Sequence, residues 1–436
     1  MTADAAPEPI GRILWRLAPM IYGPTVLFGL GEGAVIPLLP VMAASLGADV
    51  PTAALVAAAL VIGQLCGNLP AGWAVARIGE RLTMAIGGAI ALIATQGIAW
   101  VTAFGDAGLA VLGGSSFVIG MSAAAFGLAR HSFMTTRVPL SFRARALALL
   151  GGSFRLGMFV GPFVAAALLA LFGDPVATAW FFAACLLATI LLVLLGPDPE
   201  DAVGEPSPRA ESNGTSEIED TGEPVTGTVR AGGRRDPGTG VLRTMWRNRG
   251  VLTRLGLAAA CLSAVRSARQ ALLPLWGVSI GLDAQTIALV VGISGAIDFA
   301  LFYASGQVMD RFGRLWAALP ATLLMGLGFL SLSFTHDLEQ ADMWFALFAA
   351  VLGVGNGLSS GILLTLGADI APQSEPAAFL GSWRTLTDAG GAVAPLIVSG
   401  VAAAISLGAA SAVMGVVGLL GAAAFIRWVP RFVPRR

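Results

Sequence analysis

The stretch GQVMDRFGR, residues 306–314, stands between two long apolar runs and decides how the rest of the chain is understood. A related stretch, GWAVARIGER at residues 72–81, stands between two earlier apolar runs. At one constant offset three positions coincide: Gly72 with Gly306, Arg77 with Arg311, and Gly79 with Gly313. The same residue types at the same spacing and in the same context indicate two copies of one unit.

The repeat extends beyond these loops. LLPVMAASLGAD ends at Asp49 and LLPLWGVSIGLD ends at Asp283, and the same offset separates them. Later in each copy, an offset that is one position shorter aligns Pro162 with Pro395. A duplicated six-span unit predicts two halves that rock about a site near the middle of a bilayer.

Composition assigns the apolar runs to a membrane. Apolar residues make up 56% of the 436 residues and charged residues only 12%, whereas a soluble domain carries about 25% charge. Runs of about 20 apolar residues are long enough to cross a bilayer as helices. The expected spans are 17–45, 52–76, 82–104, 107–136, 143–172, 175–196, 251–279, 285–309, 315–335, 341–370, 377–406 and 408–428. We therefore expect an all-α integral membrane protein with twelve transmembrane helices in two pseudo-symmetric six-helix halves.

The two halves, 17–196 and 251–428, are separated by a stretch of different composition. Residues 197–250 are rich in Pro, Gly, Glu, Ser and Arg and poor in large apolar side chains, so they cannot bury enough surface to fold alone. We predict a disordered cytoplasmic linker there, a cytoplasmic N-terminus over 1–16 and a cytoplasmic tail over 429–436.

Charge at the span ends predicts the orientation, because loops that stay in the cytoplasm are enriched in basic residues. One side carries Arg12, Arg16, Arg77, Arg81, Arg137, Arg143, Arg145, Arg311, Arg314, Arg427, Arg431, Arg435 and Arg436. The other side carries Asp49, Asp106, Asp174, Asp283, Asp337, Glu339 and Asp342. We therefore expect a multi-pass protein of the cell membrane with both termini in the cytoplasm.

The repeated loop resembles the signature of the major facilitator superfamily, roughly G-x-x-x-D-R-x-G-R. The second half carries the signature whole, as Gly306, Asp310, Arg311, Gly313 and Arg314. The first half keeps Gly72, Arg77, Gly79 and Arg81, but has Ala76 for the aspartate and Glu80 for the next arginine. The resemblance covers nearly the whole chain except the linker, and it implies the fold of that superfamily.

In this family the second-half loop packs near the start of the fifth span, where Arg143 and Arg145 stand. Glycines permit a tight turn, and a carboxylate is stabilised at the positive N-terminal end of a helix. The resemblance therefore implies that Asp310 latches a cytoplasmic gate against that helix start. Ala76 weakens the corresponding latch of the first half. Arginines that only set the topology are the alternative.

GMFVGP, residues 157–162, is similar to the family's antiporter motif. Gly157 and Gly161 let helices approach closely, and Pro162 permits a bend; simple helix packing is the alternative. The family also expects an arginine in the fourth span before Gly120, which is thought to help proton coupling, and Ser116 stands near that place. The resemblance to drug/proton antiporters is incomplete there.

Ionisable residues inside the spans mark candidate functional sites, because charge at bilayer depth is costly unless it is paired or hydrated. The acids are Glu32, Asp298 and Asp388; the arginines are Arg155, Arg266, Arg269 and Arg384; the polar companions are Gln64, Asn68 and Asn356. The repeat aligns Glu32 with Arg266, Arg155 with Asp388, and Gln64 with Asp298. Two of these three equivalences join an acid to a base.

In the family fold, spans 1 and 7 face each other across the cavity, span 5 meets span 8, and span 2 meets span 11. The resemblance therefore implies these neighbours: Arg155 near Asp298, Asp388 near Gln64 or Asn68, and Glu32 near Arg266 or Arg269. Arg384 and Asp388, four residues apart on one helix, are alternatively a pair of their own. Trp276 and Trp383 lie deeper than the tryptophans of the interfacial belt and are candidates for lining a pocket.

A carboxylate that loses its arginine partner in one state of a low-dielectric cavity binds a proton more readily, and the proton then shifts which state is populated. Glu32 and Asp298 are the first candidates for proton-coupling sites, and Asp388 is the third. Fixed structural salt bridges are the alternative for the acids. The four arginines either contact an anionic or zwitterionic substrate or pair with the acids.

These features predict a secondary active transporter and not an enzyme. No GxxxxGK[ST] phosphate loop occurs in the sequence, so a single-chain ATP-driven pump is not expected. We expect proton-coupled efflux, by antiport and alternating access, of a small organic molecule or drug. The alternative within transport is a proton-coupled symporter that imports a small anionic or zwitterionic solute. The alternative of another class is a non-transporting membrane receptor or scaffold.

The expected partners are a small-molecule substrate, protons and the lipid bilayer. We expect no cofactor, because the proton gradient supplies the energy, and no metal, because Cys66, Cys185 and Cys261 form no ligand pattern. The formal net charge is zero, so we expect no binding to nucleic acid. We expect the protein to act as a monomer.

Overall fold

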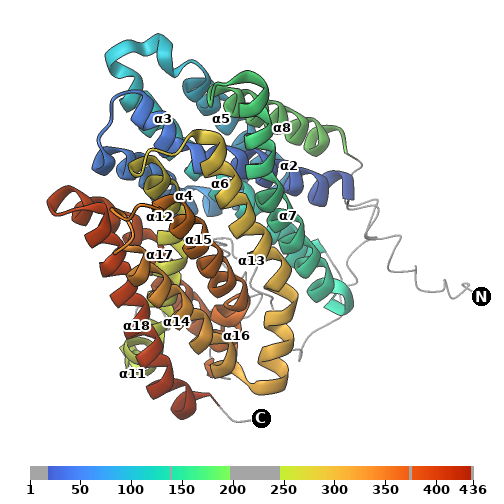
Figure 1. The fold of residues 1–436 in the computed structure, drawn as a ribbon. Helices are drawn as coiled ribbons and strands as arrows, with labels where there is room; N and C mark the ends of the chain where they lie inside the picture. Colours follow the sequence, from blue (N-terminus) through green and yellow to red (C-terminus); the bar gives the residue numbers. More distant parts are fainter. Residues whose placement is uncertain (1–17, 138–139, 197–245, 373–375, 434–436) are drawn as a thin grey trace, which may run out of the picture.

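The computed structural model describes residues 18–137, 140–196, 246–372 and 376–433. These ranges contain twelve helical segments long and apolar enough to cross a membrane, which confirms the predicted all-α fold (Figure 1). The predicted N-terminal segment, most of the predicted linker and the end of the predicted tail lie outside the described residues.

The first six spans follow one another with short turns. Their elements are η1 (Ala18–Tyr22), α2 (Gly23–Val35), η2 (Ile36–Leu38) and α3 (Leu39–Ser45) in span 1, then α4 (Val50–Ile78), α5 (Glu80–Ala99), η3 (Val101–Ala107) with α6 (Gly108–Arg137), α7 (Leu140–Phe172) and α8 (Val176–Leu195).

The second six spans repeat this order. Their elements are α11 (Arg249–Val251), η4 (Leu252–Gly256) and α12 (Leu257–Ser279) in span 7, then α13 (Ala284–Phe312), α14 (Arg314–Leu332), α15 (Ala341–Leu358) with α16 (Ile362–Ile370), α17 (Pro376–Ala404) and α18 (Leu407–Phe432).

Helix packing repeats as the sequence does. In the first half α4 packs on α6, α2 on α7, and α5 on α8; in the second half α13 packs on α15, α12 on α17, and α14 on α18. The irregular first turns of spans 1 and 7 also match, because the π-helical turns η1 and η4 are separated by the same offset as the two loops. Each half is therefore the same helical unit.

Equivalent aspartates cap the second span of each half. The Asp49 carboxylate accepts a hydrogen bond from the Thr52 amide at 3.0 Å, and Asp283 accepts one from the Thr286 amide at 3.0 Å. Such caps satisfy amides that the first helical turn leaves free. Hydrogen bonds from the threonine side chain and backbone hold the pKa of each aspartate below its usual range.

The repeated loops turn at glycine. Gly79 has φ +81° and Gly313 has φ +92°, a region that side-chain-bearing residues rarely adopt. This requirement explains why both copies of the loop keep a glycine at this position, between α4 and α5 and between α13 and α14.

Two spans that the sequence predicts as continuous are interrupted. Span 1 changes to a 3-10 turn at η2, where Pro37 and Pro40 remove backbone donors. Span 10 breaks between α15 and α16, where Gly361 adopts φ +81°. The Ser305 hydroxyl lies 2.8 Å from the carbonyl oxygens of both Leu358 and Ser360, so a neighbouring helix satisfies carbonyls that the break exposes.

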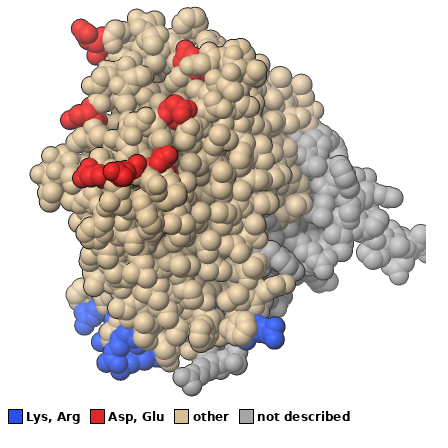
Figure 2. All heavy atoms as spheres, in the orientation of Figure 1, with Lys and Arg blue, Asp and Glu red and all other residues tan. Residues whose placement is uncertain are grey.

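Charge divides the surface into two ends, as expected from the sequence. Figure 2 shows acidic side chains at one end of the molecule and arginines at the other. We call the end that bears Asp49, Asp283 and Asp342 the acidic face, and the end that bears Arg77, Arg311 and Arg427 the basic face.

The two halves meet along α7 with α13 and along α4 with α17, the two seams that the family resemblance implied. Near the acidic face the Ser399 hydroxyl donates to the carbonyl of Pro51 at 3.0 Å, and η2 and α3 pack against α12. Contacts between the halves therefore cover the acidic end of the space between them.

Candidate functional site

A cavity of about 300 Å³ lies between the two halves. It collects every charged and polar candidate from the spans: Glu32, Gln64, Asn68, Arg155, Arg266, Arg269, Asp298, Asn356, Arg384 and Asp388. Spans that are far apart in the sequence supply these side chains, so the fold gathers into one chamber the intramembrane charges that the sequence singled out.

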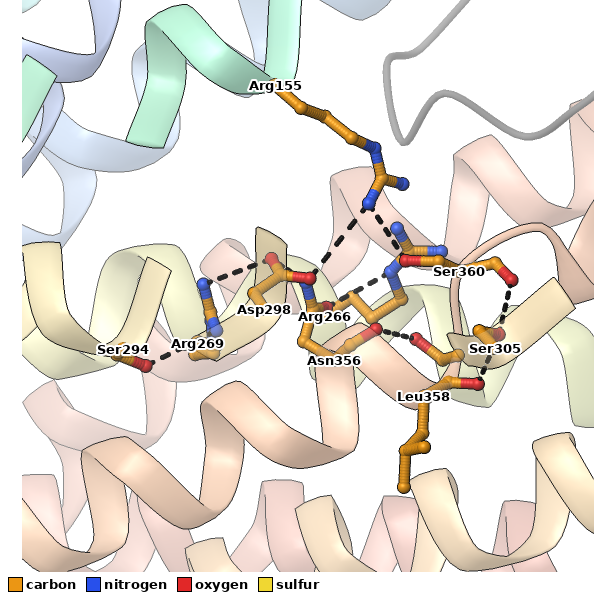
Figure 3. A network of polar contacts seen from close by, with 10 residues as sticks. Arg155, Arg266, Arg269, Ser294, Asp298, Ser305, Asn356, Leu358 and Ser360 are labelled. Carbon is orange, nitrogen blue, oxygen red and sulfur yellow. Dashed lines mark hydrogen bonds and ion pairs between the residues drawn. The ribbon is translucent and has the colours of Figure 1, made fainter. Parts of the chain in front are cut away.

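Asp298 of α13 is the centre of the second-half wall. Its Oδ2 accepts a hydrogen bond from Asn356 Nδ2 at 2.6 Å and lies 3.7 Å from Arg269 Nη2. Its Oδ1 lies 4.0 Å from Arg155 Nη1. Arg266 Nε donates to Asn356 Oδ1 at 3.2 Å, so the asparagine joins a third arginine to the group. We call these five residues the Asp298 network (Figure 3).

Arg155 links the two halves. It comes from α7 of the first half, yet its Nη1 donates to Ser360 Oγ of the second half at 2.8 Å, as Figure 3 shows. Its guanidinium also lies 4.4 Å from the centre of the Phe302 ring, a cation–π contact. The expected proximity of Arg155 and Asp298 is thus present, and Ser360 is a partner that sequence reasoning missed.

Glu32 of α2 stands on the first-half wall and is only 3% exposed. Gln64 Nε2 donates to its Oε1 at 3.4 Å. The arginine that interacts with its charge is Arg130 of α6, whereas the family resemblance implied Arg266 or Arg269.

The reason for this difference is that the second-half arginines are held in their own wall by Asp298 and Asn356. Arg130 is 2% exposed, with its guanidinium 4.9 Å from the Phe154 ring and 5.5 Å from the Phe126 ring. Arg130 was not among the site residues that the sequence predicted. Its place inside the apolar run 107–136 was the signal that it lies in the span.

Asp388 and Arg384 lie on α17 and line the cavity together with Gln64 and Asn68 of α4. Arg384 Nε is 3.9 Å from Asp388 Oδ2, so these residues form the i,i+4 pair that was the alternative expectation. The seam of spans 2 and 11 therefore brings an acid–base pair of one helix against two amides of the other half.

The two deep tryptophans have different surroundings. Trp383 lines the cavity, and its Nε1 donates to the carbonyl of Leu363 at 2.8 Å. Trp276 is fully buried, and its ring packs edge-on against His336 at 5.4 Å. Trp276 is not among the described residues that line the cavity, because α12 places it under the loop between spans 9 and 10.

Aromatic rings form an apolar part of the lining that sequence reasoning missed. Phe154, Phe159 and Phe299 all line the cavity, and the rings of Phe159 and Phe299 stack across the seam with centroids 5.4 Å apart. Their signal was their position, since Phe154 adjoins Arg155 and Phe299 adjoins Asp298 in the sequence. The chamber therefore combines charged groups with flat apolar surfaces, as ligand pockets commonly do.

The fifth-span glycines pack against span 1 beside Glu32. A β-carbon on Gly157 would lie 2.5 Å from the carbonyl oxygen of Val26, and one on Gly161 would lie 2.6 Å from the amide nitrogen of Ala34. Pro162 approaches Gly292 of the other half. Ser116, where the family expects an arginine, donates to Leu112 of its own helix.

The intact loop of the second half is fixed by Arg314. Its Nε lies 2.8 Å from Asp369 Oδ2 at the end of α16, and its Nη1 donates to the carbonyl of Met309 at 3.3 Å. Arg311 is exposed and lies 5.5 Å from the Phe312 ring. A β-carbon on Gly306 would meet open space.

The first-half loop uses different contacts. Arg81 donates to the carbonyls of Val193, Leu194 and Gly196 at the end of α8, at 2.9, 2.7 and 2.9 Å. Glu80 accepts a hydrogen bond from Ser132 at 3.1 Å, and Arg77 lies over Trp73 at 5.7 Å. A β-carbon on Gly72 has room. The side chains of Asp310, Arg143 and Arg145, which form the predicted latch, lie outside the described residues.

An internally duplicated bundle of twelve membrane helices with a charged cavity between its halves is the architecture of a secondary transporter. The profile of the Major Facilitator Superfamily matches residues 24–395, so the chain belongs to this family of transporters. No curated protein sequence matches the chain.

Solved structures share the fold at low sequence identity. A POT family transporter in complex with a thioalcohol-conjugated peptide superposes with a TM-score of 0.71 at 12% identity, over 97% of this chain and 96% of that one. An auto-inhibited POT family peptide transporter gives 0.67 at 15% identity, over 98% of each chain. The xylose transporter XylE from E. coli, in a partially occluded inward-open conformation, gives 0.63 at 15% identity, over 97% and 100%.

Proposed function

We propose that this transporter exports a small organic molecule or drug across the cell membrane in exchange for protons. The basic face is the cytoplasmic side and both termini lie there, in accordance with the positive-inside rule. The protein works as a monomer without a cofactor, and the proton gradient drives alternating access to the central cavity.

The observation that carries the proposal is one oxygen of Asp298 inside the cavity. Its Oδ1 is buried and receives no hydrogen bond from the described residues, and Arg155 Nη1 lies 4.0 Å from it. Arg155 belongs to the other half, so movement of the halves changes this distance directly. When Arg155 withdraws, a proton on Oδ1 replaces the lost positive charge.

Glu32 is the second proton site in this proposal. It is buried, and its carboxylate is held by the amide of Gln64. The glycine-rich seam of Gly157 and Gly161 lies against the same helix, which connects the packing of span 5 to the acid. Asp388, already paired with Arg384 on α17, is the third site.

Proteoliposomes test this proposal. A compound that a deletion strain fails to exclude is loaded into vesicles, and an imposed pH gradient should drive it out as protons enter. Glu32→Gln and Asp298→Asn should each abolish gradient-driven transport while exchange of labelled for unlabelled compound continues. Retention of gradient-driven transport by both variants would refute the coupling assignment. Absence of any flux would favour a non-transporting receptor or scaffold.

A second candidate is proton-coupled uptake, by symport, of a small anionic or zwitterionic solute. It is favoured by the Asp298 network, in which one carboxylate lies beside Arg155 and Arg269 and is joined to a third arginine, Arg266, through Asn356. A substrate carboxylate would add the missing negative charge when Asp298 is protonated. The same vesicles distinguish the candidates, because in symport the solute moves in the direction of the protons.

A further inference from the structure

Three arginines converge on a single tryptophan at the basic face. The guanidinium of Arg254 lies 4.9 Å from the centre of the Trp428 ring, that of Arg431 lies 5.3 Å from it and that of Arg427 lies 5.6 Å from it. Arg254 comes from η4 at the start of span 7, and the other two come from the end of α18, which is span 12. We call these four residues the Trp428 cluster.

The charge of this cluster is not balanced within the described part of the chain. The structure shows no ion pair between a described acidic residue and any of the three arginines, all of which are exposed, while the Trp428 ring is half-buried between them. Arg427 and Arg431 are also four residues apart on one helix, a spacing at which like charges destabilise each other. The arrangement therefore favours an anion that is external to these residues.

The location identifies the source of that anion. The cluster lies where two adjacent apolar helices end at the basic face, in the zone that arginine and tryptophan occupy at a membrane interface. On the face that Figure 2 shows, arginines gather at this end of the molecule, and the described surface between them and the acidic side chains is uncharged. The anions concentrated in that zone are lipid headgroups.

We propose that the Trp428 cluster binds the phosphate of an anionic phospholipid in the leaflet at the basic face. Guanidinium groups bind phosphate with two parallel hydrogen bonds. The indole packs against the glycerol and upper acyl region, as interfacial tryptophans do. The lipid thereby bridges spans 7 and 12. This site is separate from the cavity and does not depend on the direction of transport.

The first half provides an internal comparison. The repeat places Met20 at the position of Arg254 and Leu194 at the position of Arg427, so the equivalent positions of the first half lack these two arginines. The first half has instead a one-to-one pair, Arg77 over Trp73. If the arginines of the Trp428 cluster served only to orient the chain in the membrane, we would not expect the second half to gather three of them around one tryptophan while the first half has a single pair.

The test uses the full-length protein in nanodiscs of phosphatidylcholine alone or of phosphatidylcholine and phosphatidylglycerol in equal parts. Phosphatidylglycerol should raise the thermal unfolding midpoint of the wild type. The variant Arg254→Gln/Arg427→Gln/Arg431→Gln should lose most of that increment. In native mass spectrometry it should retain at most about one tenth of the phosphatidylglycerol that the wild type retains. The matched control Arg77→Gln should behave as the wild type. Equal increments in the triple variant and the wild type would overturn the proposal, as would equal midpoints of the wild type in the two lipids.

A second measurement does not depend on how well the triple variant folds. Brominated phosphatidylglycerol should quench the fluorescence of the wild type more than brominated phosphatidylcholine does. This excess should disappear in Trp428→Phe, which keeps an aromatic ring, and persist in Trp73→Phe. Loss of the excess in Trp73→Phe instead, or equal quenching by the two lipids, would show that the cluster binds no anionic headgroup.

Discussion

On the first-half wall of the cavity, the carboxylate of Glu32 accepts a hydrogen bond from the amide of Gln64. On the second-half wall, the carboxylate of Asp298 faces two arginines and an asparagine. The repeat aligns Glu32 with Arg266 and Arg155 with Asp388, so at two positions one copy has an acid where the other has an arginine. Duplication supplied the same scaffold twice, and divergence at these positions gave the two walls different charged groups.

The two repeated loops also differ in charge, because Glu80 of the first half stands at the position of Arg314 in the second. Glu80 starts α5, where the dipole of that helix favours an acid, and Arg81 contacts carbonyls at the end of α8, where the dipole of α8 favours a base. Arg314 starts α14, where the dipole disfavours a base, and Asp369 near the end of α16 compensates for it at 2.8 Å. The second-half loop is therefore fixed by an ion pair, and the first-half loop is fixed by hydrogen bonds of Glu80 and Arg81 to α6 and to the end of α8.

The largest expected effect is at Asp298. Asp298→Asn leaves the arginines of its network without their carboxylate and should lower the free energy of unfolding by about 3–5 kcal/mol, as breaking a buried ion pair does. Thermal unfolding of the purified protein measures it. Adding Arg269→Gln should recover part of the loss. A loss of the same size in Glu32→Gln would contradict the difference between the two walls.

The next effect is at the intact loop. Arg314→Gln removes a largely buried ion pair and leaves Asp369 at a helix end that disfavours it, so we expect a loss of about 2–3 kcal/mol. The exposed neighbour Arg311 provides the control, because Arg311→Gln should change stability by less than about 0.5 kcal/mol. Chemical denaturation of both variants measures this. Equal losses would show that Arg314 has no special role.

Helix seams should respond equally in the two halves. Gly157→Ala forces a β-carbon against the backbone of span 1 and should cost about 2 kcal/mol. Its repeat equivalent Gly390 packs equally tightly on Ala260 of span 7, so Gly390→Ala should cost a similar amount. Gly72→Ala, where a β-carbon fits, is the control. Expression level and melting temperature report the losses, and tolerance of alanine at Gly157 alone would break the symmetry of the seams.

The smallest effect is at the helix caps. Asp283→Ala should lower the free energy of unfolding by about 1 kcal/mol, and Asp49→Ala should shift it in the same direction. Because the folded pKa of each aspartate is lowered, the stabilisation is present above the unfolded pKa and is lost as pH falls through the folded pKa. Stability measured from pH 6 down to the acid limit (about pH 3) should therefore converge for variant and wild type. A constant difference across that range would exclude the charged cap.

Much of the architecture could be predicted because it depends on periodic or repeated signals. Long apolar runs indicated the spans, and the constant offsets between the copies indicated the symmetry. The Arg155–Asp298 contact followed from the order of helices in the family. What these signals lack is the angular position of each side chain about its helix, which decides whether a residue such as Trp276 meets the cavity or a loop.

Other features depend on local backbone detail or on contacts within one half. The break of span 10 results from Gly361 and the hydroxyl of Ser305, and neither interrupts the apolar run. Arg130 of α6 interacts with the charge of Glu32 of α2, and the rings of Phe126 and Phe28 of the same two helices stack with centroids 4.7 Å apart. Comparison between the two halves does not reveal such a partner within one half.

The break divides span 10 into two helices, α15 and α16, which are joined by Ser359–Gly361. Helix α15 carries Asn356 of the Asp298 network, and helix α16 carries Asp369, which is paired with Arg314. Arg155 of the first half donates a hydrogen bond to Ser360, within the break itself. Movement of the first half relative to the second therefore bends span 10 at this break, and α16 transmits the bend through Asp369 and Arg314 to the loop at the basic face.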